Sequence, residues 1–366
     1  MIQNLHKDTL SRLDQISIFS VTSEEYAALV RERLGKGALH ARLVYREWFR
    51  TGQVTGHDPH FRNATSLFEQ IVALTDFTYL PLLKRGDEQG TEKYLVQTGD
   101  GLEIEMVVLP MPAGYTLCVS SQVGCRMGCA FCETGKMGLL RSLSTTEILS
   151  QVFQAKHGLK VEVRNIVFMG MGEPLDNFEA VMQAVKILTD ANGFGLGPSR
   201  IALSTSGLVD KIYRLIDEAD PAVRLAISVN APQDTVRNKL MPVNYQFDMS
   251  ALRQAMEAYT VHPKRRIFIE YILIKGKTDA LEDADALAHY LRGLKVTVNL
   301  IPYNPQSRGP FEPPTVEAID LFLKRMQEHG FLTFVRGTKG QKIMAACGQL
   351  GNLALRRKKA LVFSPE

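Results

Sequence analysis

The chain has 366 residues, of which 45% are hydrophobic and 22% are charged. This length and composition predict a globular protein with two domains, or one large α/β unit with an appendage. No apolar run reaches the roughly 18 residues of a membrane-spanning helix, and residues 1–8 lack the apolar core of a signal peptide. The net charge of +4 mildly favours a polyanionic partner. We therefore expect a cytoplasmic protein and exclude secreted, membrane and fibrous classes.

The first part of the chain predicts two amphipathic helices, at 23–34 and 38–50, joined by the glycine turn 35–37. Residues 31–50 carry six Lys or Arg against two acids, and the only tryptophan, Trp48, lies among them. Such a basic hairpin could grip a nucleic-acid backbone. The alternative, which this segment alone favours, is a solvated helix face with Trp48 in a local core.

Residues 94–97 and 103–109 alternate like strands and predict a connecting hairpin. After it, apolar runs alternate with helical periodicity. Strands are expected at 115–121, 164–169, 200–205, 223–229, 266–273, 296–301 and 331–335, and helices at 145–157, 178–190, 208–217, 249–260, 281–292 and 315–328. The first of these helices opens with a capping box, Ser144 and Glu147. Six strand–helix units predict an open partial barrel whose functional groups follow the carboxyl ends of its strands.

The expected organisation has four parts. A basic helical accessory domain, a candidate for nucleic-acid binding, spans residues 1–90, and the hairpin spans 91–110. The barrel spans 111–345. A C-terminal segment, 346–366, carries a cysteine and a basic tail.

The cysteines are unevenly distributed, because four of the five lie within residues 118–132 and the fifth is Cys347. Cys125, Cys129 and Cys132 form C-x-x-x-C-x-x-C after the first barrel strand. Three thiolates on a short loop suit three irons of a [4Fe–4S] cluster, which leaves the fourth iron open to a small chelating molecule. Structural zinc is the alternative, but it prefers four ligands, and Cys118 is expected on the strand.

Four segments make the sequence recognisable. They are Leu117–Cys125, Phe168–Leu175, Leu300–Pro305 and Ala345–Leu350. Together with the cysteine loop, they resemble the RlmN/Cfr RNA adenine methyltransferases of the radical S-adenosylmethionine (SAM) superfamily, over about residues 20–350. The resemblance implies a partial (β/α)6 radical-SAM barrel, a [4Fe–4S] cluster, and SAM as cofactor. It also implies methylation of an adenine ring carbon in 23S rRNA or tRNA, with C2 favoured and C8 the alternative.

The resemblance also assigns a SAM site. Gly172 and Glu173 follow the second barrel strand, where the carboxylate can accept the cofactor's ammonium group. The family's remaining SAM positions match Ser204, Ser228, Val229, Asn230 and Asn304. For each polar residue among these, capping of a strand end is an equally good interpretation.

By the same resemblance, Cys347 carries a methyl group taken from one SAM, and a second SAM supplies the radical that passes it to adenine. Cys118 then forms a transient disulfide with Cys347 by thiol exchange. The family's proton acceptor aligns with Glu105. From the residues alone, Glu105 reads as a solvent-facing strand residue, and Glu103 is an equal candidate.

RNA is the expected partner, and its target base must be extruded for the chemistry. The basic runs 264–266 and 356–359 are further candidates to grip phosphates. An electron donor such as flavodoxin or ferredoxin is also expected, and the chain is expected to be a monomer.

Three positions depart from the family pattern: Asn230 replaces its usual histidine, 342–344 replaces Asp-Ile-Asp, and Glu133 replaces Ser or Ala. Two other functions stay open. One is a zinc-stabilised RNA-binding module without catalysis, and the other is a different radical-SAM reaction in which Cys118 and Cys347 are structural.

Overall fold

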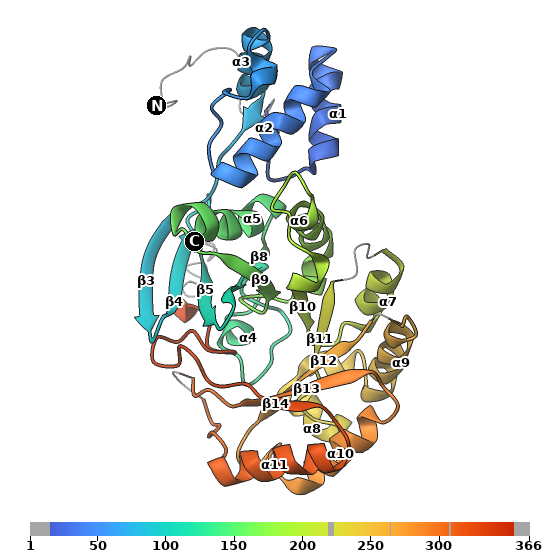
Figure 1. Cartoon of the computed structure of the whole chain (residues 1–366). Helices are drawn as coiled ribbons and strands as arrows, with labels where there is room; N and C mark the ends of the chain where they lie inside the picture. Colours follow the sequence, from blue (N-terminus) through green and yellow to red (C-terminus); the bar gives the residue numbers. More distant parts are fainter. Residues whose placement is uncertain (1–14, 219–222, 264, 307–308, 355–366) are drawn as a thin grey trace, which may run out of the picture.

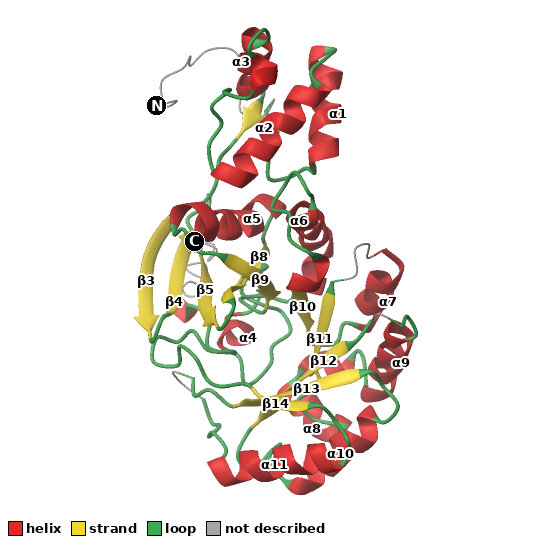
Figure 2. Ribbon diagram, in the orientation of Figure 1, coloured by secondary structure: helices red, strands yellow, loops and turns green. Residues whose placement is uncertain are grey.

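The structure is a computed structural model that describes residues 15–218, 223–263, 265–306 and 309–354. A group of N-terminal helices stands at one end of a larger α/β unit, as Figures 1 and 2 show. No helix among the described residues is long and apolar enough to cross a lipid bilayer.

The N-terminal group contains the two predicted helices, α1 (Ser23–Leu34) and α2 (Ala38–Thr51). Thr22 and Glu25 form a capping box that starts α1. Gly35 and Gly37 both have positive φ, which glycine adopts without strain, and so the chain reverses sharply between the helices. The group is completed by β1 (Ile16–Ser17), η2 (Pro59–Phe61), α3 (Thr65–Ala73) and β2 (Thr75–Asp76).

An aromatic cluster attaches these helices to the α/β unit. The ring of Trp48 stacks on that of Phe153 with 4.7 Å between centroids, and Phe19 packs edge-on against both. Trp48 is only 8% exposed. Of the two interpretations of this residue, the structure supports the core position.

A ten-stranded sheet forms the centre of the molecule, with the order β14-β13-β12-β11-β10-β9-β6-β5-β4-β3. Its strands are β3 (Leu82–Glu88), β4 (Thr91–Gln97), β5 (Glu103–Met111), β6 (Gly114–Cys118), β9 (Val163–Phe168), β10 (Ile201–Thr205), β11 (Arg224–Ser228), β12 (Ile267–Leu273), β13 (Val296–Pro302) and β14 (Thr333–Val335). The strands from β6 to β14 pair in parallel, whereas β3, β4, β5 and β6 pair antiparallel. The predicted hairpin is thus part of the same sheet.

Helices connect the parallel strands and cover the outer face of the curved sheet (Figure 2). They are α5 (Thr145–Phe153), α6 (Phe178–Thr189), α7 (Val209–Glu218), α9 (Met249–Thr260), α10 (Leu281–Leu291) and α11 (Val316–Glu328). Each lies between two consecutive parallel strands. Six strand–helix units therefore form the open barrel that the sequence predicts. A π-helical turn, η3 (Gln154–Gly158), extends α5, whose predicted capping box is present.

The sequence did not predict three elements in and around the sheet: β3, α4 (Glu133–Met137) and α8 (Asp234–Leu240). β3 pairs with β4 in the sheet, although the accessory helical domain was expected to reach residue 90. Its sequence, LLKRGDE, does not alternate, because an edge strand tolerates charges and glycine that an inner strand would not. The helices α4 and α8 are too short to show a periodicity.

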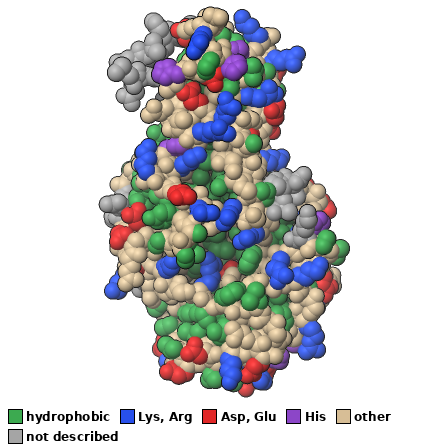
Figure 3. Space-filling model, viewed as in Figure 1, with side chains coloured by type: hydrophobic (Ala, Val, Ile, Leu, Met, Phe, Trp, Pro, Cys, Tyr) green, Lys and Arg blue, Asp and Glu red, His purple; other side chains and the backbone are tan. Residues whose placement is uncertain are grey.

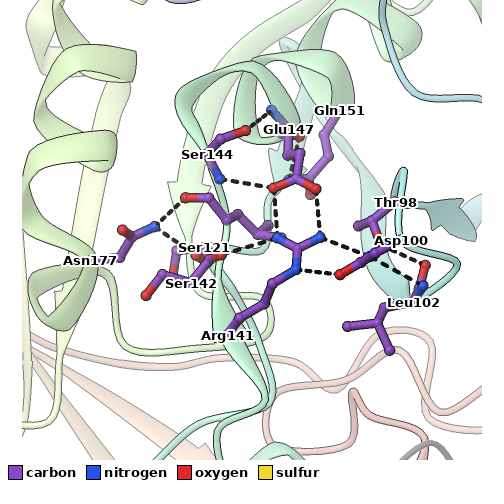
Figure 4. A network of polar contacts seen from close by, with 11 residues as sticks. Thr98, Asp100, Leu102, Ser121, Arg141, Ser142, Ser144, Glu147, Gln151 and Asn177 are labelled. Carbon is purple, nitrogen blue, oxygen red and sulfur yellow. Dashed lines mark hydrogen bonds and ion pairs between the residues drawn. The ribbon is translucent and has the colours of Figure 1, made fainter.

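Arg141 joins the β4–β5 turn to α5 and to the loop before it (Figure 4). Its guanidinium binds Asp100 through Nε (2.7 Å) and Glu147 through Nη1 (2.8 Å) and Nη2 (2.7 Å). Asn177 donates to the carbonyls of Ser121 (2.9 Å) and Leu143 (2.7 Å) beside it. These contacts hold together the segments that enter and leave the cysteine loop.

Candidate active site

Two adjoining cavities lie inside the barrel. The inner cavity, of about 160 Å³, is lined by the cysteine loop and by the carboxyl ends of β9 to β12. The outer cavity, of about 390 Å³, lies among β5, β6, β9 and β10 and the loop after β14. Four side chains line both cavities: Met169, Ile301, Arg336 and Cys347.

The cysteine loop is shaped by glycines. It leaves β7 (Gln122–Val123) and returns through β8 (Arg141–Ser142), which pairs antiparallel with β7. Gly124 has φ +80°, and a Cβ added there would lie 1.9 Å from the carbonyl oxygen of Gly138. Only glycine fits at this close approach. The backbone N–H of Cys125 donates to the same carbonyl (3.1 Å), which closes the base of the loop.

The loop brings Cys125, Cys129 and Cys132 to the wall of the inner cavity. Burial raises the pKa of each thiol, and in Cys125 and Cys129 the neighbouring cysteines raise it further. Loop N–H groups lower these pKa values but do not outweigh burial, whereas iron cations would offset three thiolates. Among the described residues, no three Cys, His, Asp or Glu side chains are close enough to hold one metal ion. Three cysteine ligands without a fourth suit a cluster whose cysteines each bind a different iron better than tetrahedral zinc, which usually takes four protein ligands in structural sites.

Glu173 is buried at the carboxyl end of β9, beside that loop. Its carboxylate accepts hydrogen bonds from the N–H of Leu175 (3.2 Å) and from the N–H (2.8 Å) and hydroxyl (2.9 Å) of Ser206. Burial nevertheless raises its pKa. Gly172 has φ +105°, and a Cβ there would meet Gln122 at 2.6 Å. The strand end thus presents a fixed carboxylate to the inner cavity, as an ammonium ligand requires.

The other predicted SAM residues divide between the cavities. Ser204, Ser228 and Asn230 line the inner cavity. Val229 is fully buried and lines neither cavity. Asn230 has φ +58°, a conformation that Asn and His both tolerate, which is why it can replace the family's histidine. Asn304 instead lines the outer cavity.

Asn304 contributes an unused acceptor. Its Nδ2 donates to the carbonyl oxygen of Cys347 (3.1 Å), but its buried Oδ1 has no partner among the described residues. Buried polar atoms rarely stay unsatisfied. A ligand with a hydroxyl or amino group, such as SAM, fits this position.

Cys118 and Cys347 both line the outer cavity. Cys118 ends β6 and is 8% exposed, and burial together with the nearby Cys347 raises its pKa to about 12. Cys347 is exposed in a turn after β14 and is the cysteine that also reaches the inner cavity. This turn is bonded to the cysteine loop, because the N–H of Glu133 donates to the carbonyl of Gly348 (2.8 Å).

Glu105 does not line either cavity, and it is not a solvent-facing residue. Its side chain is buried behind the Cys347 turn, where one oxygen pairs with Lys93 Nζ (3.0 Å) and the other accepts from Gly351 N–H (2.8 Å). Burial raises its pKa, although Lys93 opposes this effect. Lys93 also donates to the carbonyl of Met344 (3.2 Å). Glu103 is more remote and meets only Asn352 Nδ2, at 3.5 Å.

Sequence reasoning missed two arginines. Arg237 is fully buried in α8 and donates to the carbonyls of Val229 (3.0 Å), Ser206 (2.6 Å) and Ser228 (3.1 Å), so it fixes the strand ends that carry the predicted SAM residues. Arg336 lies between the cavities and pairs with the buried Glu270 (3.1 Å). Its place directly after the last predicted strand was the only sequence signal for it.

The predicted phosphate-binding runs are only partly visible. Lys264 and the basic tail 356–359 lie outside the described residues. In the N-terminal helices, Arg42 is already paired with Glu24 (2.5 Å) and Arg46 with Asp58 (3.7 Å).

Comparison with known proteins gives a consistent result. Residues 119–290 match the family model of the radical SAM superfamily. A probable dual-specificity RNA methyltransferase RlmN 1 of Protochlamydia amoebophila is 53% identical, with 96% of this chain and 98% of that protein covered. The RlmN of Magnetococcus marinus is 36% identical over 92% of this chain and 94% of its own length. A radical SAM methyltransferase structure from Sphaerobacter thermophilus superposes with a TM-score of 0.84 at 37% identity, covering 92% of this chain and 99% of that one.

Proposed function

Because this chain belongs to the RlmN family of radical SAM RNA methyltransferases, we propose that it methylates an adenine ring carbon in RNA through a methyl group carried on Cys347. The observation that supports this route best is the position of Cys347, whose side chain lines both cavities. A thiol at that junction can receive a group from a cofactor in one cavity and present it to a base in the other.

Both proposed cofactor sites include residues that line the inner cavity. We propose that Cys125, Cys129 and Cys132 hold a [4Fe–4S] cluster. SAM would be held by Gly172, Glu173, Ser204, Ser228 and Asn230 at the inner cavity. The proposed site also includes the buried Val229 and, from the outer cavity, Asn304. When bound, these groups supply the methyl donor and the one-electron chemistry, because an adenine ring carbon is not nucleophilic enough for direct methyl transfer. The residues of the chain supply binding, orientation and proton transfer.

Glu105 is the proposed proton acceptor. Once a carbon radical has been added to the ring, the hydrogen on that ring carbon must leave as a proton and one electron must leave the adduct; a bound cluster would be the acceptor for that electron. Burial raises the pKa of this carboxyl group, which makes it a stronger base than an exposed glutamate. Its hydrogen bond from Gly351 places it directly behind the turn that carries Cys347.

Cys118 is proposed to release the product. Its thiolate attacks the sulfur of Cys347, forming a disulfide while the sulfur–carbon bond breaks. The electron pair of that bond and a proton complete the new methyl group on the base. A cellular thiol reductant must then restore both cysteines. Because the pKa of Cys118 is raised, this attack needs a base or a local shift that favours the thiolate.

The finer assignments follow from the family resemblance. We propose C2 as the position, with C8 as the alternative, and 23S rRNA or tRNA as the substrate. The proposal also includes flavodoxin or ferredoxin as electron donor, a monomer, a cytoplasmic location, and the helical segment 1–90 as an RNA contact.

The test uses the full chain, purified and reconstituted without oxygen. The wild type should contain iron and sulfide, should become methylated on Cys347 when given SAM, and should then methylate transcribed 23S rRNA. Cys347→Ala should keep the iron but lose both methylations. Protein that contains zinc instead of iron would refute the proposal in favour of an RNA-binding module. Methylated RNA without S-methylcysteine at Cys347 would indicate another radical-SAM reaction.

A further inference from the structure

The charged side chains that line the outer cavity are all positive. The lining includes four cations, Arg200, Arg224, Arg336 and Lys339, and no Asp or Glu. Glu270 balances Arg336 from the inner cavity. Within the part of the chain that the structure describes, the other three cations form no ion pair. Three uncompensated positive charges therefore surround this cavity.

Cations on the barrel helices are only partly balanced, because Lys324 on α11, for example, forms no ion pair among the described residues. Arg214 pairs with Glu179 and Glu218, and Arg325 pairs with Asp285. These pairs lie on the helical layer, away from the cavities. What distinguishes the outer cavity is that every charged side chain in its lining is a cation and that only Arg336 among them has an acidic partner in the described residues.

Neutral groups hold each of the three cations near the cavity. Arg200 Nη1 donates to Asn165 Oδ1 (3.4 Å), and the Arg224 guanidinium lies 5.7 Å from the centroid of a phenylalanine ring, that of Phe268. Lys339 Nζ donates to the carbonyl of Pro110 (2.7 Å). All three side chains are exposed. They come from η5 (Pro198–Arg200), the start of β11 and the loop after β14, so they approach the cavity from different segments.

The interior of the cavity is apolar by contrast. Its walls include Leu109, Val167, Ile201 and Ile301. In Figure 3, Lys and Arg side chains gather around a hollow in the middle of the face, over the region where Figure 1 draws β9 to β11. An apolar cavity of about 390 Å³ with a cationic mouth matches a nucleotide, whose base is flat and weakly polar and whose phosphates are anionic.

We propose that Arg200, Arg224 and Lys339 form a clamp for the RNA backbone, binding the phosphates next to the target nucleotide while its base enters the outer cavity. The inference rests on the proposed function, since it assigns the substrate of the same site. It locates the phosphate contacts at the amino ends of β10 and β11 and in the loop after β14, whereas the sequence directed attention to the N-terminal helices and to the runs at 264–266 and 356–359.

The test compares two double variants with equal loss of charge. Arg200→Gln/Arg224→Gln removes part of the clamp, and Arg292→Gln/Lys324→Gln removes two exposed cations at α10 and α11. The probe is a synthetic RNA hairpin with one unpaired adenosine in its loop, and binding is measured by fluorescence anisotropy at several salt concentrations. For single-stranded RNA, each lost phosphate contact lowers the slope of log affinity against log salt by about 0.7.

We expect the clamp variant to lose about 1.4 in slope and to bind RNA roughly 10- to 100-fold more weakly at moderate salt. The control pair should keep the wild-type slope. Replacing the two phosphates beside the adenosine with uncharged methylphosphonates should weaken the wild type but have little further effect on the clamp variant. Lys339→Gln should lose about half as much slope as the double variant.

An unchanged slope in the clamp variant, or an equal methylphosphonate effect in the variant and the wild type, would overturn the proposal. The binding assay needs no catalysis, so its outcome is independent of whether the proposed methylation occurs. The methylation assay tests the proposed function separately. If that function is wrong, the wild type would not methylate Cys347 or RNA, whatever the salt slope. Methylation of Cys347 takes place before RNA takes part in the reaction. If the clamp variant is still methylated on Cys347, its barrel is intact.

Discussion

The buried pair of Lys93 and Glu105 gives the sharpest single prediction, for Lys93→Met. Lys93 Nζ lies 3.0 Å from the carboxylate and 3.2 Å from the carbonyl of Met344. At that distance, and with an effective dielectric constant of about 20, the two charges attract by about 5.5 kcal/mol before the cost of desolvation. Removing one member of a buried pair typically costs about 3–5 kcal/mol, because the other charge stays buried.

This cost depends on pH. Burial already raises the pKa of Glu105, and the loss of Lys93 removes the main effect that opposes it. The other charged group that acts on this carboxyl is Glu103, which also raises its pKa. A raised carboxyl pKa means that the folded state binds more protons than the unfolded state, so stability falls as pH rises. The variant should therefore be near wild-type stability at about pH 5 and lose most at about pH 8.

The assay is urea unfolding across this pH range, combined with the pH profile of RNA methylation by protein already methylated on Cys347. Lys93→Met should shift the rising limb of the profile to higher pH, and Lys93→Arg should restore it in part. Lys324→Met, on the exposed side of α11, is the control and should change neither measurement. Equal stability and an unchanged pH profile in Lys93→Met would refute the reasoning.

Three further variants test other parts of the structure. Cys118→Ala should leave RNA covalently bound to Cys347, because no thiol remains to break the sulfur–carbon bond; denaturing gels detect the adduct. Gly124→Ala should abolish iron binding, since its new Cβ would lie 1.9 Å from a carbonyl oxygen. Arg141→Met should lower the free energy of unfolding by about 1–2 kcal/mol, because it breaks one exposed and one mostly buried ion pair.

Each of these variants has a clear opposing result. Free methylated RNA at the wild-type rate from Cys118→Ala would exclude a resolving role for that thiol. Gly101 also has positive φ, but a Cβ added there meets no atom within 4 Å. Gly101→Ala should therefore lower the free energy of unfolding by about 1 kcal/mol and keep its iron. If both glycine variants lose iron equally, backbone strain and not the close contact is responsible. Wild-type stability in Arg141→Met would show that its two ion pairs contribute nothing net.

Local sequence patterns predicted the helices, the inner strands and the cysteine loop, because interactions between residues close in the sequence determine these features. Apolar periodicity identified the long helices and the inner strands, since each must bury one face. The 3-and-2 spacing of the cysteines identified the loop, because that spacing alone places three thiols on one short turn. The capping box at Ser144 marked the start of α5.

Contacts between distant segments could not be predicted in this way. Glu105 and Gly351 are 246 residues apart, and nothing in either neighbourhood predicts that one caps the other. Arg237 was missed because it acts on backbone carbonyls, which every residue possesses. Asn304 was assigned to the SAM residues by family resemblance, and only the structure shows that it lines the outer cavity and donates to the carbonyl of Cys347. The direction of a side chain at a strand end depends on the neighbouring loops.

The turn that carries Cys347 is held partly by the cysteine loop and partly by Asn304 and Glu105. Its backbone is fastened to the cysteine loop by the bond from Glu133 N–H to the Gly348 carbonyl (2.8 Å) and by the Thr134 hydroxyl on the carbonyl of Leu350 (2.5 Å). Oxygen damage that unravels the metal-binding segment would therefore also remove two of the bonds that position the reactive thiol. A molecule in this state would lose its metal site and weaken the support of its methyl-carrying cysteine together. We therefore expect it to be inactive before RNA becomes covalently attached.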